Sequence, residues 1–414
     1  MGNRAPVQWN FDASAGVQPF PEVVESMVAS LRRRSGNPAS FHHRAKSLRQ
    51  EISRTREKLV NWLTGGRGHW ECVFTSGGAE AACMAVRGGA HASRRFGNHL
   101  IMSTVEHPVV LEQGRILEQE GFEVSLIGAD REGFVDMDGI RDSLKDSTVM
   151  VVVQAANQDV GTVQRIEALS EVLGERGVLL LLDGTFACGW LDPEPLLRIA
   201  DGIFLSFHRF FGPVGLGALV FRRGLAIESL IPGGAQESGL RAGLENYHAL
   251  AGLDAWLSVV SDGARRSELV EKARLNQMAA LRKLRSRLPG LYLNGPEPGD
   301  NRLANGLNIS LAGIEGESVV LRSDLKGLLL GSGSACLGSR AETGLVLKAM
   351  KATQDRILGS VSLSPGPFID PDELDAALEV FIESVEFLRA LDPQWEEKMM
   401  DREAMDFAMG FEIP

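Results

Sequence analysis

One cysteine of this sequence stands in a setting that favours a reactive thiol. Cys336 lies in the segment 331–339, which consists almost entirely of small residues, so little bulk shields its sulfur. An exposed thiol can act as a nucleophile or as a metal ligand. The spacing of cysteines and histidines does not fit a self-contained zinc site. The remaining cysteines fit the inert core positions that most lone cysteines occupy: Cys72, Cys83 and Cys188.

Three polar side chains follow apolar runs that are typical of strands. His107 comes after the run 99–103, Asn157 lies in a polar loop, and Asp183 ends a run of four leucines. In an open α/β sheet, ligands bind beyond the carboxyl ends of the strands. Asp183 could pair with a cationic ring nitrogen or cap a helix, and His107 could be functional or structural. The residues alone leave these alternatives open.

Two further segments have the composition of an anion site. The glycine-containing turn 75–80 joins an expected strand to an expected helix, where free N–H groups and the helix dipole favour a phosphate. Such a turn can equally be a simple helix cap. The segment 206–209 offers hydroxyl, imidazole and guanidinium groups to a phosphate or carboxylate. The candidate ligands are Ser76, Gly77, Gly78, Ser206, His208 and Arg209.

These side chains need a sheet that brings several strand ends together. Short β-rich runs alternate with amphipathic helical stretches, which predicts a mainly parallel α/β sheet covered on both faces. Helices are expected near Ala45, after Gly78 and over 164–176. The expected strands are 70–75, 99–103, 123–127, 149–154, 178–183, 202–206 and 218–221.

Near Leu257 the pattern changes to that of a smaller α+β domain. A long charged helix over 267–288 is followed by two strand-like runs, 307–311 and 328–332, and by further helices near Leu345 and over 371–388. The methionine-rich tail is expected to pack as a helix on the protein's own core, with docking on a partner as the alternative. The expected division is a large domain over 1–256, a small domain over 257–392 and a tail over 393–414, with residues 1–20 packing on the small domain.

Composition excludes several classes of function. The chain has 414 residues, of which 44% are hydrophobic and 23% charged, so it can bury a large core. The formal net charge of −11 argues against a general binder of nucleic acid or of anionic membranes. The N-terminal residues lack the apolar stretch of a signal peptide, and no apolar run reaches ~18 residues. We therefore expect a cytoplasmic protein with reduced thiols.

Taken together and in this order, the segments resemble the cysteine desulfurases. These are class V aminotransferases among the fold-type I enzymes that use pyridoxal phosphate (PLP). The resemblance covers nearly the whole chain, from the segment 36–42 to 307–310, 313–318 and the cysteine loop. It implies a large domain of fold-type I PLP-transferase type around a mainly parallel seven-stranded sheet. It also implies a smaller α+β C-terminal domain and a homodimer with composite active sites.

The resemblance also assigns roles to the candidate residues. His107 matches the residue that stacks on the PLP ring, Asp183 the partner of the ring nitrogen, and Asn157 a residue that contacts the ring. Ser206 and His208 match ligands of the phosphate, which the turn of Ser76, Gly77 and Gly78 also approaches. Cys336 matches the mobile nucleophile that becomes a persulfide.

The sequence departs from this family at the residue that carries its chemistry. The family motif Ser-x-His-Lys supplies a lysine that forms a Schiff base with PLP. Here Arg209 takes that place, and a guanidinium is essentially never deprotonated. Of 43 basic residues, 34 are arginine and 9 are lysine, which codon bias can explain, but no lysine lies between Lys145 and Lys272. Other polar groups that the family uses are missing as well. Ala79 and Phe186 stand where the resemblance implies polar side chains, and Leu244 stands where a side chain would reach across the dimer. The arginine that would bind the substrate carboxylate is missing near Ser360.

Four hypotheses follow. The first is a desulfurase-like homodimer without an internal aldimine, which acts in sulfur transfer or iron–sulfur assembly. Cys336 would then carry a persulfide made elsewhere or ligate an iron–sulfur cluster shared with a scaffold or acceptor protein. The second is an enzyme of altered chemistry that uses non-covalent PLP, its amine form or another anion, with His107, His208 or Arg209 at work. The third is a conventional PLP-dependent desulfurase, and the fourth is a purely structural partner.

Overall fold

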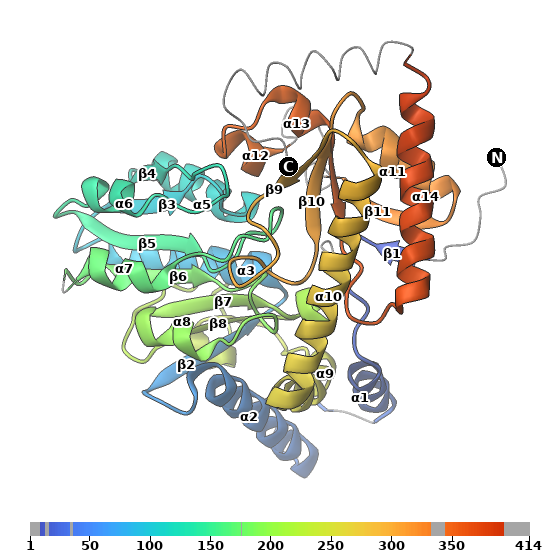
Figure 1. The fold of residues 1–414 in the computed structure, drawn as a ribbon. Helices are drawn as coiled ribbons and strands as arrows, with labels where there is room; N and C mark the ends of the chain where they lie inside the picture. Colours follow the sequence, from blue (N-terminus) through green and yellow to red (C-terminus); the bar gives the residue numbers. More distant parts are fainter. Residues whose placement is uncertain (1–8, 13–15, 34–35, 175, 333–343, 393–414) are drawn as a thin grey trace.

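The computed structural model describes residues 9–12, 16–33, 36–174, 176–332 and 344–392. Two β-sheets organise these residues, and helices cover both (Figure 1). The cysteine loop around Cys336 and the tail 393–414 lie outside the described residues, so the predictions made for them stay predictions.

The larger sheet has seven strands in the order β2-β8-β7-β6-β5-β3-β4. Five neighbouring strands, β7, β6, β5, β3 and β4, run parallel, and β8 runs antiparallel to β7 and β2. The predicted mainly parallel α/β sheet is therefore confirmed. Its strands are β2 (Trp70–Thr75), β3 (His99–Ser103), β4 (Glu123–Ile127), β5 (Thr148–Gln154), β6 (Leu179–Asp183), β7 (Gly202–Ser206) and β8 (Gly217–Arg222).

The central strands form because their side chains are apolar on both faces. In β5, Val151 and Val153 pack into one core cluster while Met150 and Val152 pack into another. Two-sided burial of this kind is typical of a parallel sheet covered by helices. One face is covered by α2 (His43–Thr64), α6 (Met137–Ser143), α7 (Ile166–Leu173) and α8 (Glu194–Ile199). The other is covered by α3 (Gly78–Cys83), α4 (Gly89–Ser93) and α5 (Pro108–Gln119).

The second sheet has five strands in the order β1-β11-β12-β10-β9. The N-terminal strand β1 (Trp9–Phe11) pairs in parallel with β11 (Leu328–Ser332), the strand that leads into the cysteine loop. The other strands are β9 (Leu291–Asn294), β10 (Leu307–Leu311) and β12 (Ser360–Leu363). The helices in this part of the chain are α10 (Gly263–Arg287), α11 (Gly316–Leu325), α12 (Leu345–Ala349), α13 (Gln354–Leu358) and α14 (Pro371–Arg389).

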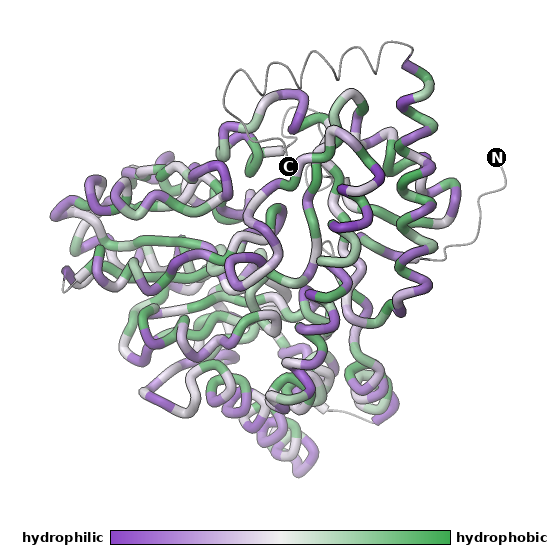
Figure 2. Tube along the Cα trace, viewed as in Figure 1, coloured by the Kyte–Doolittle hydropathy of each residue, from purple (hydrophilic) through white to green (hydrophobic). Residues whose placement is uncertain are grey.

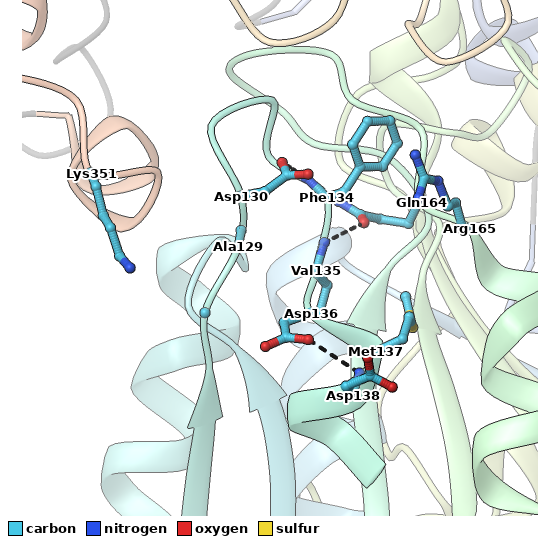
Figure 3. Close-up of a pocket in the computed structure, with 11 residues that line it drawn as sticks. Ala129, Asp130, Phe134, Val135, Asp136, Met137, Asp138, Gln164, Arg165 and Lys351 are labelled. Carbon is cyan, nitrogen blue, oxygen red and sulfur yellow. Dashed lines mark hydrogen bonds between the residues drawn. The ribbon is translucent and has the colours of Figure 1, made fainter. Parts of the chain in front are cut away.

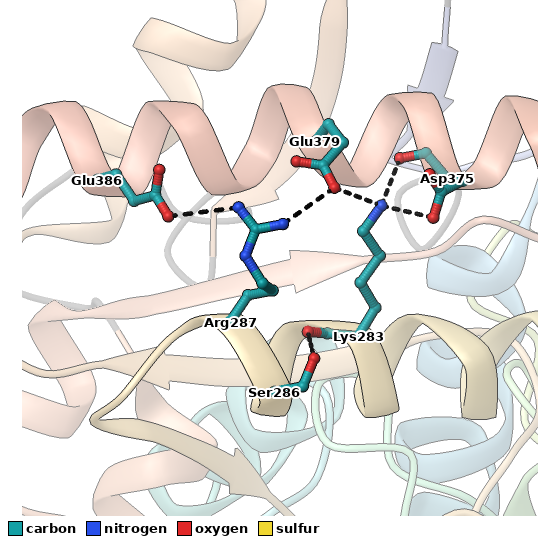
Figure 4. A network of polar contacts seen from close by, with 6 residues as sticks. All are labelled: Lys283, Ser286, Arg287, Asp375, Glu379 and Glu386. Carbon is teal, nitrogen blue, oxygen red and sulfur yellow. Dashed lines mark hydrogen bonds and ion pairs between the residues drawn. The ribbon is translucent and has the colours of Figure 1, made fainter.

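Two of these helices are joined by apolar packing and by ion pairs. Leu281 and Leu284 of α10 share a core cluster with Leu378 and Phe381 of α14. At the surface, Lys283 and Arg287 pair with three carboxylates of α14 (Figure 4): Asp375, Glu379 and Glu386. Exposed pairs of this kind add little stability each, so the apolar contacts carry the packing.

Helices α1 (Pro21–Arg32) and α9 (Tyr247–Val260) pack together at the base of the molecule in the view of Figure 1. The predicted domain boundary at 256/257 falls inside α9, and the division stays a prediction. Figure 2 shows hydrophobic residues along the strands and hydrophilic ones on the outer turns of the helices. Among the described residues, no helix combines the length and apolar character needed to cross a membrane.

Candidate functional site

The predicted polar residues meet beyond the carboxyl ends of β3, β5, β6 and β7. His107 is the N-cap of α5, and its Nδ1 accepts a hydrogen bond from the Val109 N–H at 3.2 Å. Burial, with a smaller effect from the charge of Arg209, lowers the pKa of His107 to about 4. The imidazole is therefore neutral at neutral pH. It caps α5 and also lies at the site, so its position is compatible with both the structural and the functional alternative.

Asn157 and Asp183 are both buried and both bonded to the protein. The Asn157 side chain donates to the Val105 carbonyl at 3.1 Å and accepts from two N–H groups of its own loop. Asp183 Oδ1 accepts from the Thr185 N–H at 2.8 Å, so the carboxylate also organises the turn after β6. The sequence left open a helix cap and a partner of a cation for Asp183. A turn, not a helix, follows β6 directly, and the role as partner of a cation stays a prediction.

Ser206 and His208 are bonded to one another. Ser206 Oγ and His208 Nδ1 lie 2.8 Å apart, within the turn of 3₁₀ helix that follows β7. Burial, and to a lesser degree Arg209, lowers the pKa of His208 to about 4. The neutral imidazole offers no positive charge to an anion, and its Nδ1 shares a hydrogen bond with the neighbouring hydroxyl.

Arg209 lies at the centre of the site. Its Cζ is 4.5 Å from the ring centroid of Phe186, a cation–π contact. The Phe186 ring in turn lies 6.5 Å from the His107 ring, centroid to centroid, with 28° between the ring planes. The positive charge of Arg209 lowers the pKa of His107 and of His208 and opposes the effect of burial on Asp159 and Asp183.

Two carboxyl groups of the site were not selected from the sequence: Glu106, which is buried, and Asp159, which is partly exposed. Burial raises the pKa of Asp159 to about 6, as it does for Asp183. Burial, with a contribution from Asp183, raises the pKa of Glu106 to about 8. Both residues stand inside motifs that the sequence analysis did identify, next to Asn157 and His107. The available signal was an acidic residue in the loop that follows an apolar strand.

Glu106→Gln is expected to flatten the pH dependence of stability. Glu106 Oε1 accepts from Ser103 Oγ at 2.5 Å and from the Gln154 N–H at 2.9 Å, bonds that an amide oxygen can also accept. Because the folded-state pKa of about 8 lies above the ordinary 4.5, the stability from this group is complete below pH 4.5 and lost as the pH rises to 8. The loss has a slope of up to ~1.4 kcal/mol per pH unit.

Urea unfolding of both proteins between pH 5 and 9 measures this difference. The exposed Glu171 provides a control, because Glu171→Gln should keep the slope of the unchanged protein. Identical pH profiles for the unchanged protein and Glu106→Gln would show that Glu106 is ionised in the folded state.

The turn after β2 is closely packed against β7 and β8. The Ser76 N–H donates to Glu80 Oε2 at 2.7 Å, and Glu80 pairs with Arg241 at 2.8 Å. A Cβ added at Gly78 would lie 2.9 Å from the Cβ of Ser206. The predicted cradle residues Ser76, Gly77 and Gly78 therefore do come together with Ser206, but one cradle N–H is already taken by a carboxylate.

The segment before α1 closes one side of the site. The Val17 N–H donates to the His208 carbonyl at 3.4 Å, and the charge of Arg209 acts on Asp12. From the other side, Trp190 Nε1 donates to the Arg209 carbonyl at 3.3 Å. The chain on both sides of Arg209 is thus fixed by neighbouring elements.

The cysteines singled out from the sequence are not part of this cluster. Cys336 lies outside the described residues. Cys72 and Cys188 are buried and burial raises the pKa of each to about 12, while Cys83 is half-buried. No group of three or more metal-ligating side chains occurs within the part of the chain that the structure describes.

Leu244 and Ser360 complete the set of positions discussed from the sequence, and Ser360 is buried at the start of β12, close in the chain to Arg356 of α13. Leu244 is exposed on the loop before α9. Arg356 Nη2 donates to Asn294 Oδ1 at 2.5 Å and to the Leu293 carbonyl at 3.3 Å, at the edge of the small sheet.

A separate cavity of about 460 Å³ lies between the segment 128–138 and the turn after α12 (Figure 3). Lys351 reaches it from one side and Arg165 from the other, with Asp136 and Asp138 at its edge. None of the predicted site residues lines this cavity, so it is not the site described above.

Fold and site define a member of the aminotransferase class V family. The model of that family matches residues 9–359 of this chain. The chain belongs to this family and, within it, to the cysteine desulfurases, as its relatives show. It is 33% identical over 392 residues to the cysteine desulfurase IscS of Clostridium botulinum, with 95% of this chain and 98% of that protein covered. The cysteine desulfurase IscS of Methanosarcina thermophila is 36% identical over 389 residues, covering 92% of this chain and 93% of that protein.

A solved structure agrees with these relatives. A NifS-like protein matches with a TM-score of 0.84 and 25% identity, over 92% of this chain and 100% of that one. The predicted family and the predicted fold-type I architecture are therefore confirmed.

The residues at the site do not fit PLP held in the manner that the family resemblance implies. The guanidinium of Arg209 keeps its proton and cannot form an imine. Ser206 and His208, the expected phosphate ligands, are bonded to one another. Phe186 presents an apolar ring where a hydrogen-bonding side chain is expected, and it packs against Arg209.

Proposed function

We propose that this protein acts in sulfur transfer or iron–sulfur cluster assembly as a cytoplasmic homodimer that forms no internal aldimine with PLP. Membership of the cysteine desulfurases supports the sulfur-related role. The single observation that carries the rest is Arg209, which stands at the lysine position of the family motif and packs on Phe186. The chain therefore lacks, at this position, the amine nucleophile with which the family's reaction begins.

In this proposal Cys336 receives sulfur that another protein has mobilised. Its thiolate attacks the outer sulfur of a donor persulfide, a new S–S bond forms on Cys336, and the donor leaves as a thiolate. The exchange needs no oxidant, because one persulfide is consumed and one is formed. Ligation of an iron–sulfur cluster shared with a scaffold protein is the alternative use of the same thiolate.

Exposed apolar side chains support the homodimer. Val24, Val28 and Leu31 are 42%, 37% and 61% exposed and follow one another on α1 at the spacing of a helix face. Leu244 is 52% exposed on the loop that the family resemblance places at the dimer contact. Burial of such a stripe against a second copy is the expected way to cover it.

Absorbance and sulfur loading of purified protein test the proposal. We expect the absorbance spectrum to contain no band from an aldimine and to stay unchanged when borohydride is added. We also expect the protein to release no sulfide from free cysteine. With a persulfide donor, the unchanged protein should gain one sulfur by mass spectrometry and Cys336→Ser should gain none. Cys188→Ser, at a buried thiol, is the matched control and should still load. A yellow protein that borohydride bleaches, or equal loading of Cys336→Ser, would contradict the proposal.

Arg209→Lys alone is expected not to restore cysteine desulfuration. The new amine would still face the Phe186 ring and the mutually bonded Ser206 and His208. Sulfide release from cysteine in the presence of added PLP is the measurement, and it should stay at the level of the unchanged protein. Full activity from this single change would mean that the rest of the site still accepts the cofactor.

A further inference from the structure

We propose that the C-terminal tail, residues 393–414, docks on an apolar groove between α11 and α14 of its own chain. Four large apolar side chains border this groove, and their exposed fractions lie between 45% and 65%: Leu321, Leu325, Phe387 and Leu391. The inference makes the sequence-based expectation for the tail specific, because it names the surface that the tail covers. It does not depend on the proposed function.

The groove is formed by two helices that pack side by side (Figure 1). Lys326, at the C-cap of α11, pairs with Glu383 of α14. One turn earlier in α11, Arg322 lies on the ring of Phe387, one turn later in α14, with 3.3 Å between Cζ and the ring centroid. The two helices therefore run antiparallel, and these contacts show which flank of each helix borders the other.

Exposed apolar residues lie along both sides of this contact. On α11, Leu321 and Leu325 are four residues apart and share one outward face, next to the flank that carries Arg322. On α14, Phe387 contacts Arg322, and Leu391 follows four residues later, just beyond the end of the helix. The opposite faces of both helices are buried in the core of the small sheet. Since the four side chains stay exposed, no element of the described ranges covers this strip.

The position of the tail makes it the occupant that reaches the groove most easily. The tail begins at Pro393, two residues after Leu391, which is itself part of the groove. A segment attached by so short a connection has an effective concentration on the order of 1 mM at the groove. A separate protein would need a comparable concentration, or a higher affinity, to displace it.

The composition of the tail suits an apolar groove. Met400, Ala404, Phe407 and Phe411 are separated by the intervals of a single helix face. Left in water, such a face would be an exposed apolar surface that favours association with other molecules. Docking removes the groove and this face from water together, which is the main favourable contribution to such a contact.

The charges of the tail and the groove are complementary. The tail has six acidic and two basic side chains, a net charge of −4. At the groove, Arg322 has no ion pair with any residue that the structure describes, and its Nε is buried without a hydrogen-bond partner. A buried donor without an acceptor costs free energy, and a carboxylate of the tail can supply the acceptor.

Trypsin cleavage of the full chain tests the docking, because the tail contains two sites for this protease, Lys398 and Arg402. A docked tail is cut only when it opens. Leu325→Gln makes the groove more polar and should speed the cleavage by about tenfold. Leu275→Gln, at an almost equally exposed leucine of α10, is the matched control and should leave the rate unchanged. Equal rates for Leu325→Gln and the unchanged protein would overturn the inference.

Two variants of the tail test the other side of the contact. Phe407→Gln lies on the apolar face and should speed cleavage at Lys398 and Arg402 as Leu325→Gln does. Met405→Gln lies on the opposite side of the helix that the spacing predicts, so it should not. Cleavage that responds equally to both changes, or to neither, would contradict the predicted face.

A cross-link shows whether the tail lies on its own chain. In the variant Leu325→Cys with Phe407→Cys, a short bismaleimide should join the two new thiols within one chain, and peptide mapping by mass spectrometry identifies the link. The pair Leu275→Cys with Phe407→Cys is the control and should not be joined. A product with the mass of two chains would place the tail on a second copy and overturn the assignment, as would the absence of any link at position 325.

Discussion

Glu237→Gln is expected to lower the free energy of unfolding by about 3–5 kcal/mol. The side chain of Glu237 is 2% exposed and accepts two hydrogen bonds from Arg56, at 2.6 and 2.9 Å. It also accepts from the Phe74 N–H at 2.8 Å, in the strand that ends at the Ser76 turn. The amide removes the charge and turns an N–H group toward a guanidinium, so Arg56 is left without its counter-ion.

The Arg56–Glu237 ion pair also holds an unfavourable backbone conformation in place. Glu237 and Ser238 have φ values of +47° and +57°, in the left-handed region that non-glycine residues rarely adopt. Such a conformation persists only where surrounding contacts fix it. Loss of the pair should therefore also loosen the loop 231–246, which carries Leu244 and the partner of Glu80.

Urea unfolding followed by circular dichroism measures the effect. Glu268→Gln breaks an exposed ion pair with Lys272 by the same chemical change and should leave the midpoint unaltered. An unaltered midpoint for Glu237→Gln as well would show that Arg56 finds another partner. Faster proteolysis within 231–246 in the variant would localise the loosening.

Gly217→Ala is expected to cost about 3 kcal/mol and to distort the turn at Ser76. A Cβ at Gly217 would lie 2.5 Å from the Gly77 carbonyl carbon and oxygen and 2.8 Å from the Leu205 carbonyl oxygen. All three are backbone atoms: the Leu205 carbonyl belongs to β7, and the Gly77 carbonyl belongs to the turn that follows β2. Gly217 is held against both because it pairs with Thr75 on one side and with Ser206 on the other. The methyl group can be accommodated only if β8 moves away from β2 and β7.

Gly263→Ala is the control for this substitution. Gly263 begins α10 and a Cβ there meets no atom within 4 Å, so the same change should be neutral or slightly stabilising. Denaturant midpoints and the near-ultraviolet circular dichroism of the aromatic residues near the site measure the difference. Equal midpoints for both variants would show that the turn yields to the added methyl group.

The strands of the large sheet could be predicted from sequence to within one residue at either end. Segments such as 70–75 and 99–103 match β2 and β3 in full, because short apolar runs bounded by polar turns leave little choice of limits. The ends of helices were harder to predict than the ends of strands. The helix expected over 164–176 is shorter, Ile166–Leu173, because the Gln164 side chain bonds Val135 and Gly133 and Gly174 adopts a positive φ.

Long-range pairing explains what the sequence did not reveal. The strand Trp9–Phe11 is too short to recognise without its partner β11, some 320 residues away in the chain. The Arg56–Glu237 pair likewise joins residues 181 positions apart. The family resemblance predicted that His107, Asp183 and Arg209 belong to one site, but not that Arg209 would lie on the Phe186 ring. That contact depends on side-chain directions, which follow only from the folded sheet.

The pairing of β1 with β11 has a practical consequence for aggregation. β1 covers one edge of the five-stranded sheet, so removing Trp9–Phe11 would expose the edge of β11 that it covers, at Leu328, Leu329 and Leu330. An uncovered apolar edge of this kind recruits strands from other molecules. Truncated forms of this protein that begin after Phe11 should therefore associate through β11 at high concentration, and tags placed at the N-terminus should leave the first strand intact.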